Sequence, residues 1–338
     1  MAQTLTDILS AALAARTALI VSLHAEKTTA YRILHGGAEG APGLVVDRYG
    51  DTLLVQTFHK PLLAEELQEL QTFYATALPG LNMVYNDRSQ PFSRVANALL
   101  GQEQRRAELQ IEFEEIGVKY RFAARHGGQD PWLFLDLRAG RRRVLREAHG
   151  RTVLNTFAYT CGIGVAAAVA GAAEVVNVDF AASSLRVGQD NARLNGIVQG
   201  ISFVQCDAFA ALRQYSGLGQ ASVVRGKRLP NFPALAPRAF DLVVLDPPRL
   251  AKSPFGVVDL VNDYAAIFKP AVLATAEGGL VLCTNNVAEV EREVWGDQLE
   301  RCARKAGRPI QNIEWLEPEA DFPSRDGKFP LKVALLRV

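Results

Sequence analysis

Short apolar runs and helical segments alternate along the second half of the chain. From residue 150 onward, each apolar run is followed by a stretch with helical periodicity. This alternation is typical of a parallel β-sheet whose strands are joined by crossover helices. The seven runs cover residues 152–158, 174–180, 201–207, 240–246, 279–285, 310–317 and 331–338. The pattern therefore predicts an α/β fold with a doubly wound, seven-stranded sheet.

The first third of the chain has a different pattern, which predicts a smaller α+β domain. Hydrophobic spacing and turn residues indicate helices over 4–25 and 61–76, strands at 29–34 and 82–86, and a hairpin broken at Tyr49-Gly50-Asp51. A second hairpin over 111–124 turns at Gly117. We place the domain boundary at this hairpin, which gives an N-terminal domain over 1–112 and a second domain over 113–338.

Composition and charge limit the classes of function. The chain has 338 residues, of which 49% are hydrophobic, and this length fits two domains with sizeable cores. The formal net charge is only +1, so any surface that binds nucleic acid must be local. Asp7 and Arg16 interrupt the apolar N-terminal segment, which favours an amphipathic helix over a signal peptide or membrane span. We expect no membrane association.

The four cysteines are far apart in the sequence and form no CxxC pair. Cysteines at such spacing argue against both a structural zinc site and a disulfide framework. We therefore expect no metal and a reducing, cytoplasmic location.

A glycine loop follows the first strand of the predicted parallel sheet. Gly162 and Gly164 lie between this strand and a helix, where a side chain would keep the backbone from approaching a ligand. The spacing also satisfies a relaxed dinucleotide fingerprint, so alone it is a weak signal. Asp179 and Asp207 end the next two strands, where carboxylates reach a ribose diol and an adenine amino group. Each aspartate is also explained as a helix cap or a turn residue.

The fourth run of the sheet ends in Asp246-Pro247-Pro248. Two prolines fix the backbone and remove two donors, which leaves carbonyls and one carboxylate to accept hydrogen bonds from a nucleobase. A dehydrogenase needs a general acid and base near its nicotinamide, typically a histidine. All five histidines precede the glycine loop, so hydride transfer is the weaker interpretation.

With these residues assembled, the chain resembles the bacterial large-subunit (23S) ribosomal RNA methyltransferases, which include 5-methylcytosine and N7-methylguanine enzymes. The resemblance covers residues 30–338. It rests on PGLVVDRYGD (42–51), LFLDLRAGRRRV (133–144), LNTFAYTCGIG (154–164), VDFAASSLRVGQDNARLNG (178–196), DLVVLDPPRLAKS (241–253) and GGLVLCTNN (278–286). It implies a class I, Rossmann-like methyltransferase fold whose last strand is antiparallel, S-adenosylmethionine as cofactor, and ribosomal RNA as substrate.

The resemblance also implies roles for individual residues. Those at the cofactor are Phe157, Tyr159 and Gly162 at the methionine end, Asp179 at the ribose, Asp207 at the adenine, and Asp136, Arg138 and Arg142 in a segment that closes over it. A solvated helix face also explains the run of arginines. Many relatives begin with an RNA-binding barrel, whereas this chain begins at a helix; the basic insertion 216–238 is an alternative source of RNA affinity. The domain 1–112 forms one wall of an RNA cleft in this interpretation.

The methylated atom is left open by the residues after the fifth strand. The 5-methylcytosine branch has a nucleophilic cysteine there, because carbon 5 reacts only after a thiolate adds to carbon 6. In this chain the position is Asn286, and Cys283 lies three residues earlier within the predicted strand. The pair Asn285-Asn286 resembles the guanine-N7 branch, which needs no covalent adduct. We favour N-methylation with Asp246, Pro247, Pro248 and Asn286 at the reaction site.

Three alternatives remain at this stage. They are 5-methylcytosine formation with Cys283 as nucleophile, methylation of a small molecule, and a non-catalytic RNA-binding scaffold. The oligomeric state is also open, a homodimer included.

Overall fold

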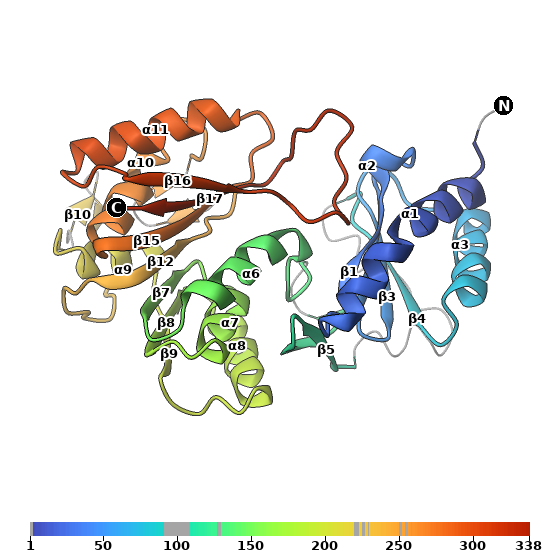
Figure 1. Cartoon of the computed structure of the whole chain (residues 1–338), viewed down its shortest axis with the longest axis horizontal. Coiled ribbons are helices and arrows are strands. Elements are labelled where there is room, and N and C mark those ends of the chain that lie inside the picture. The colour runs from blue at the N-terminus through green and yellow to red at the C-terminus, as the bar shows by residue number, and fades with distance from the viewer. Residues whose placement is uncertain are drawn as a thin grey trace. The chain divides into compact units, whose positions relative to one another are not determined.

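The protein is divided into two compact units in the computed structural model (Figure 1). The first unit comprises Met1–Leu135 and Glu319–Lys328, and the second comprises Asp136–Pro318 and Phe329–Val338. The structure describes residues 3–90, 109–126, 130–219, 230–249 and 259–338, and the backbone of four two-residue strands, 223–224, 227–228, 252–253 and 256–257.

A seven-stranded sheet forms the centre of the second unit. Its strands are β7 (Thr152–Thr156), β8 (Glu174–Asp179), β9 (Ile201–Gln205), β12 (Phe240–Leu245), β15 (Thr275–Asn285), β16 (Asn312–Leu316) and β17 (Lys332–Arg337). The spatial order is β16-β17-β15-β12-β7-β8-β9, and β17 is antiparallel to both of its neighbours. The predicted fold class is therefore confirmed, including the antiparallel last strand.

Helices cover both faces of this sheet. They are the 3₁₀ turn η2 (Leu135–Leu137), which begins at the end of the first unit, α6 (Arg138–Glu147), α7 (Gly162–Val169), α8 (Ala182–Leu194), α9 (Ala208–Tyr215), α10 (Ala265–Leu273) and α11 (Arg292–Lys305). Alternate residues of β12 enter different cores, as side chains of a strand must. Leu242 and Val244 pack with α6 and α7, whereas Val243 and Leu245 pack with α9, α10 and α11.

The first unit contains a four-stranded sheet in the order β1-β2-β3-β4. Its elements are α1 (Leu5–Ala25), β1 (Ala30–His35), α2 (Gly36–Glu39), β2 (Leu44–Tyr49), β3 (Thr52–Thr57), α3 (Ala64–Ala77) and β4 (Asn82–Asp87). The predicted hairpin joins β2 to β3, and α3 crosses over to make β3 and β4 parallel. The hydrophobic core of the unit lies on the face of the sheet that α1 and α3 cover.

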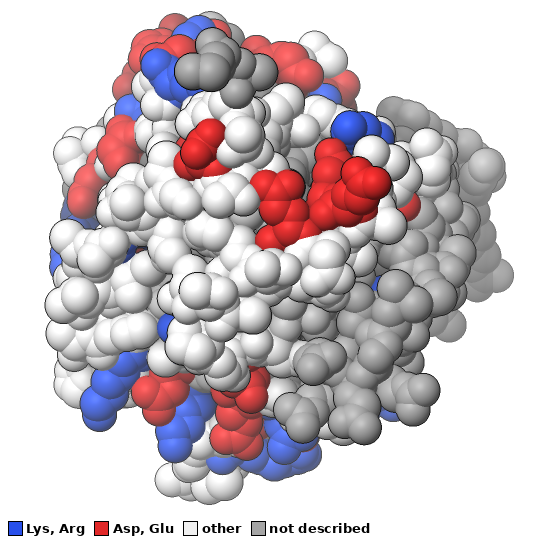
Figure 2. Space-filling view, turned by 90° about the vertical axis from the view of Figure 1, so that its right-hand side faces the viewer, with Lys and Arg blue, Asp and Glu red and all other residues white. Residues whose placement is uncertain are grey.

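Helix α1 is long and largely apolar. It is long and apolar enough by composition to cross a membrane. However, Leu9 and Leu23 lie in the core of the first unit, and the buried Arg16 forms an ion pair with Glu39 at 2.5 Å, so one side of the helix packs against that unit. Figure 2, seen from the side where α1 and α3 lie in Figure 1, has a broad uncharged area between groups of charged side chains.

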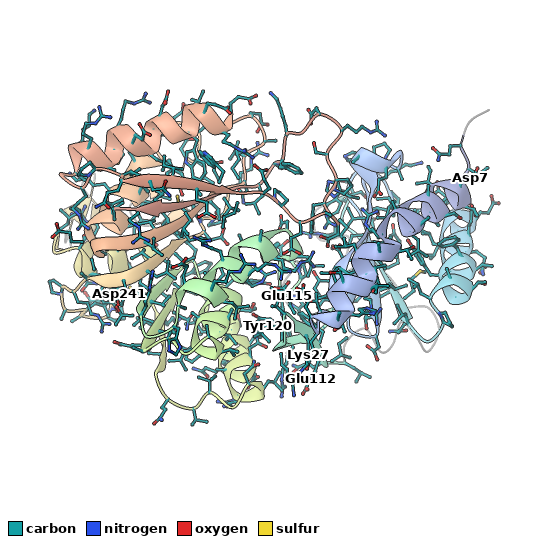
Figure 3. All side chains as sticks on the ribbon, in the orientation of Figure 1. Asp7, Lys27, Glu112, Glu115, Tyr120 and Asp241 are labelled. Atoms are coloured by element: carbon teal, nitrogen blue, oxygen red, sulfur yellow. The ribbon has the colours of Figure 1, made fainter. Side chains whose placement is uncertain are left out.

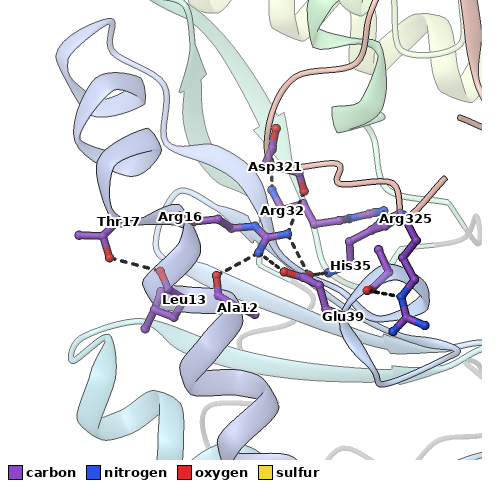
Figure 4. Close-up of polar contacts among 10 residues, drawn as sticks. Ala12, Leu13, Arg16, Thr17, Arg32, His35, Glu39, Asp321 and Arg325 are labelled. Atoms are coloured by element: carbon purple, nitrogen blue, oxygen red, sulfur yellow. Dashed lines mark hydrogen bonds and ion pairs between the residues drawn. The ribbon is translucent and has the colours of Figure 1, made fainter. Parts of the chain in front are cut away.

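Residues from near the C-terminus return to the first unit. The Asp321 carboxylate accepts a hydrogen bond from the Arg32 backbone at 2.9 Å, and its carbonyl accepts one from Arg16 at 3.1 Å (Figure 4). The Arg32 guanidinium lies 4.6 Å from the centre of the Phe322 ring. The sequence pattern showed no sign of this return, because the contacting residues are about 290–305 positions apart.

The second predicted hairpin belongs to the first unit. It consists of β5 (Ile111–Glu115) and β6 (Val118–Phe122), and the Glu114 carbonyl accepts a hydrogen bond from the Thr29 amide at 2.8 Å. Figure 3 labels Lys27, Glu112, Glu115 and Tyr120 around it. The compact units divide after Leu135, whereas the boundary predicted from the sequence lies after residue 112.

Little of the basic insertion is described by the structure. Arg225 lies outside the described residues, and Lys227 and Arg228 are described only as the backbone strand β11 (Lys227–Arg228), paired with β10 (Val223–Val224). A second small hairpin is formed by β13 (Lys252–Ser253) and β14 (Gly256–Val257). The proposed role of the insertion in RNA binding stays a prediction.

Candidate functional site

The predicted site residues follow neighbouring strands of the large sheet. In the parallel pairs, Thr156 lies beside Leu245, and Leu245 lies beside Cys283. Adjacent strands are about 4.8 Å apart, so the residues that follow them share one edge of the sheet. Strands β7 and β12 are the central neighbours at which the chain reverses its direction of winding, and open α/β sheets bind ligands at such a point.

The loop after β7 has a strained backbone. Phe157, Tyr159 and Cys161 have φ angles of 54°, 48° and 61°, in the left-handed region that non-glycine residues seldom adopt. Such conformations persist only where the surroundings hold them, and they are concentrated at functional sites. The sequence did not reveal this strain, because none of the three residues is a glycine.

Asp179 holds this loop against the end of β8. One carboxylate oxygen accepts a hydrogen bond from the Tyr159 amide at 2.8 Å, and the other accepts one from the Ala181 amide at 2.8 Å. Burial raises the pKa of the Asp179 carboxyl above its ordinary value, while these amide donors oppose the shift. Phe180 follows directly and is 75% exposed. Phe180 was assigned no role from the sequence.

Gly164 is needed for packing, and its expected role in the approach of a ligand stays a prediction. A Cβ atom at this position would lie 1.9 Å from Oδ1 of Asn177 on β8. The same oxygen accepts a hydrogen bond from Asn155 of β7 at 2.9 Å. The glycine therefore lets α7 pack directly over a buried amide pair that joins the two strands.

Replacing Gly164 with alanine should destabilise the second unit. We expect the free energy of unfolding to fall by about 1–3 kcal/mol, because overpacking forces buried groups apart. Thermal unfolding monitored by circular dichroism measures the effect. Gly37→Ala is a matched control, since no heavy atom lies within 4 Å of the added Cβ. An unchanged Tm for Gly164→Ala would contradict the packing role.

Asp207 caps a helix. One of its carboxylate oxygens accepts a hydrogen bond from the Ala210 amide at 3.1 Å, at the beginning of α9. Asx side chains at this position satisfy donors that the helix cannot pair internally. The capping role is therefore established, and contact with an adenine stays a prediction.

Asp246 directly follows β12, and its side chain is partly buried. One of its carboxylate oxygens accepts a hydrogen bond from Oγ1 of Thr284 on β15, at 2.5 Å. Burial raises the pKa of Asp246 to about 6, and the negative charge of Asp136 adds to the increase. The Thr284 donor and the Arg141 guanidinium both favour the charged form. Pro247 is buried and Pro248 is exposed.

Two arginines of α6 are buried, so the solvated-face interpretation is wrong for them. Arg138 is 0% exposed and Arg141 is 2% exposed. Arginine is almost never fully buried unless it is paired. Arg143, farther along the helix, is partly exposed and pairs with Glu147 and Glu314. The first turns of α6 thus bring charged groups inward, and Arg141 lies close enough to Asp246 to affect its pKa.

The residues considered for catalysis at the end of β15 differ in their exposure to solvent. The buried Asn285 amide donates to the Leu260 carbonyl and accepts from the Val287 backbone, both at 3.0 Å. Both ends of the Asn285 amide are therefore occupied by hydrogen bonds within the protein. Asn286 is exposed at the strand end. Cys283 is completely buried, and burial raises the pKa of its thiol far above the ordinary value.

Among the described residues, no group of three or more His, Cys, Asp or Glu side chains is arranged to hold a metal ion. The described polar groups at the sheet edge are instead carboxylates, amides and hydroxyls, each placed at the end of a strand.

Comparisons with known proteins agree with this architecture. The family model described as S-adenosylmethionine-dependent methyltransferase matches residues 31–337. The Ribosomal RNA large subunit methyltransferase I of Aeromonas hydrophila is 30% identical over 302 residues, which cover 87% of this chain and 70% of that protein. A Ribosomal RNA large subunit methyltransferase of Deinococcus radiodurans is 31% identical over 306 residues, covering 89% of this chain and 70% of that protein.

Solved structures share the fold. A methyltransferase solved in complex with SAH superposes with a TM-score of 0.79 at 22% identity, covering 98% of this chain and 80% of that one. An S-adenosylmethionine-dependent methyltransferase from Streptococcus mutans has a TM-score of 0.77 at 23% identity, with the same coverage. Because the family model matches residues 31–337, it covers nearly the whole chain and assigns the chain to this family. The chain belongs to the family of S-adenosylmethionine-dependent methyltransferases, and its cofactor is S-adenosylmethionine.

Proposed function

We propose that the protein methylates a base of large-subunit ribosomal RNA at a ring nitrogen. The RNA substrate is supported by the two curated relatives that are at least 30% identical, both named for this activity. A bacterial enzyme with this substrate works in the cytoplasm, where ribosomes are assembled.

The residues after β7 and β8 fit an adenosyl cofactor. Each carboxylate oxygen of Asp179 accepts one backbone amide hydrogen and has a further lone pair, which can accept a hydrogen bond from a ribose hydroxyl. The exposed Phe180 ring offers a face to the adenine. Phe157, Tyr159 and Gly162 then line the methionine end, in the strained loop. When bound, S-adenosylmethionine supplies a methyl group activated by its positively charged sulfur.

Methylation at nitrogen is favoured by the contrast between Asn286 and Cys283. A thiolate is the nucleophile in cysteine chemistry, and burial in apolar surroundings raises the pKa that governs its formation. Cys283 lies within the core of the sheet, and its thiol pKa is strongly raised. Asn286 instead presents an amide at the exposed edge, where a base can be held without a covalent bond. This contrast is the observation that carries the proposal.

Asp246 serves to orient the base in this mechanism. Its pKa is about 6, so the carboxylate is ionised at pH 7–8 and acts only as a hydrogen-bond acceptor. It accepts from an amino or imino group of an extruded base. The Thr284 hydroxyl fixes the orientation of the carboxylate, while Pro247 and Pro248 stiffen the backbone that carries it. Asp136 and Arg138 belong to the segment that closes over the cofactor. The protein thus positions the ring nitrogen for in-line attack.

The product identifies the reaction directly. The purified protein is incubated with radiolabelled S-adenosylmethionine and total RNA from a strain that lacks its gene, and the labelled nucleoside is identified after digestion. We expect 7-methylguanosine. Labelled 5-methylcytidine would refute the N-methylation proposal, and label absent from RNA despite cofactor binding would refute the RNA substrate.

The Cys283→Ala variant should keep full activity. The side chain is buried, so we expect a stability loss of about 1 kcal/mol but methyl transfer within about twofold of wild type. Initial rates with the RNA substrate measure the outcome. Cys302→Ala, at another buried cysteine, controls for the loss of packing. A folded Cys283→Ala variant without activity would support the alternative mechanism in which the Cys283 thiol is the nucleophile.

A further inference from the structure

The sheet of the first unit has a second face that is polar at one end. Leu53 and Val55 of β3 point into the hydrophobic core under α1 and α3, so Gln56 and Phe58 belong to the other face or its continuation. In the parallel pair of β3 with β4, Gln56 lies beside Asn86. Phe58 and Arg88 therefore follow two neighbouring strand ends side by side.

Phe58 is an exposed ring held by a fixed cation. Its side chain is 41% exposed, and the Arg88 guanidinium lies 5.2 Å from the ring centre. Arg88 is itself fixed by an ion pair with Asp130 at 2.7 Å. The cation covers part of the ring and limits its motion, while the remaining surface is open to solvent. A pre-positioned aromatic surface of this kind stacks well with a nucleobase.

Two buried donors near this pair have no acceptor among the described residues. They are the Gln56 amide nitrogen, on a side chain that is 3% exposed, and the Ser89 hydroxyl. A buried donor without a partner is costly, and a ligand that supplies the acceptor removes the cost. By contrast, the neighbouring Asn86 amide is fully used, since it donates to the Ala124 carbonyl and accepts from Arg125. Gln56 lies two residues before Phe58 on β3, and Ser89 directly follows Arg88 after β4.

Lys60, two residues beyond Phe58, has an exposed ammonium group. The Lys60 side chain is 76% exposed, and its described ion pair is a long 3.9 Å contact with Glu66. Lysine on such a surface can neutralise a phosphate at little cost. Because the whole chain carries a net charge of only +1, contacts with RNA must come from local groups of this kind.

We propose that this end of the first unit binds one unstacked nucleotide of the RNA substrate. The base stacks on Phe58, the Lys60 ammonium contacts its phosphate, and the Gln56 amide donates to the base edge. Arg88 positions the Phe58 ring. The inference rests on the proposed RNA substrate and gives the first unit a direct part in holding it.

Binding of single-stranded RNA tests this site. Fluorescence anisotropy of a labelled oligouridylate of about 12 nucleotides is measured with the full chain at several salt concentrations. Phe58→Leu should raise Kd at least about fivefold without changing the salt dependence, since stacking of one base contributes at least 1 kcal/mol. Lys60→Gln should reduce the slope of log Kd against log salt by about 0.7, as expected for one lost phosphate contact.

Matched controls come from the same unit. Val21→Ala removes part of another exposed apolar side chain, and Lys27→Gln removes another lysine of the same unit. Both should bind the oligonucleotide as wild type does. Thermal unfolding and cofactor binding check that each variant is folded, and Lys60→Gln keeps the test informative if Phe58→Leu does not fold.

The outcomes separate this site from the proposed function. If the wild type methylates RNA but Phe58→Leu and Lys60→Gln bind the oligonucleotide normally, only the nucleotide site is refuted. If the wild type binds S-adenosylmethionine but neither binds nor methylates RNA, the RNA substrate is refuted and the site with it. Weaker binding by Phe58→Leu and a reduced salt slope for Lys60→Gln, with unchanged controls, support the site.

Discussion

The Asp246→Asn variant is expected to lose methyl transfer while remaining at least as stable as the wild type at pH 8. Asparagine has the same shape, and its oxygen still accepts the Thr284 hydrogen bond. Its amide group, however, replaces an acceptor with a donor facing the base. We expect kcat/KM to fall by about 100-fold or more, by analogy with the loss of one preorganised hydrogen bond at a reacting group. Cofactor affinity should be unchanged.

The stability part of this prediction follows from the pKa of Asp246. Its folded-state value of about 6 exceeds the ordinary 3.8, so the native chain binds more protons than the unfolded chain between these pH values. The free energy of unfolding therefore falls as pH rises through this window, and the ionised carboxylate destabilises the fold above it. Asparagine removes that charge. Urea unfolding at pH 5 and pH 8, with single-turnover methyl transfer, measures both effects.

Asp241 provides the matched control at the opposite end of the same strand. It lies at the amino end of β12 (Figure 3) and accepts two hydrogen bonds from Thr152, both at 2.8 Å. Asp241→Asn should lower stability but leave the turnover of folded protein unchanged. Normal turnover by Asp246→Asn would refute the proposed contact between this carboxylate and the base.

The Thr284→Val variant should move the acid limb of the pH–rate profile to higher pH. The Thr284 hydroxyl favours the charged form of Asp246, so its removal raises the pKa of Asp246 above about 6. A hydrogen bond to a charged group contributes about 1.5–3 kcal/mol, which corresponds to a shift of about one pH unit or more. The profile of kcat/KM between pH 5 and pH 9 measures it. Activity should be lost near pH 6.5 and largely recovered at pH 9.

Serine at position 284 tests whether the hydroxyl is responsible. Thr284→Ser keeps the donor and should retain the wild-type profile, whereas valine keeps only the shape of the side chain. A uniform loss of rate at every pH in the valine variant would mean that Thr284 acts through packing alone. A wild-type profile in the valine variant would show that Asp246 is not the group that titrates.

The hydrophobic pattern was enough to place the strands of both sheets and the edge at which the candidate site lies. For example, the apolar run 240–246 became β12 (Phe240–Leu245), and the run 174–180 became β8 (Glu174–Asp179). Alternation between strands and helices allows few packings, and parallel strands end at a common edge. Asp179 and Asp246 could therefore be assigned to the same edge from their positions along the chain.

The roles of individual side chains at that edge emerge only from the folded chain. Asn285 looked equivalent to Asn286 in the sequence, yet its side-chain amide is hydrogen-bonded to the backbone of Leu260 and Val287. A solvated helix face was an alternative explanation for Arg138, which the fold buries completely. Asp321 joins the first unit although nearly 290 residues separate it from Arg32. Hydrophobic periodicity encodes which face of an element is buried, whereas hydrogen bonds and charge pairs depend on which distant groups come within about 3 Å.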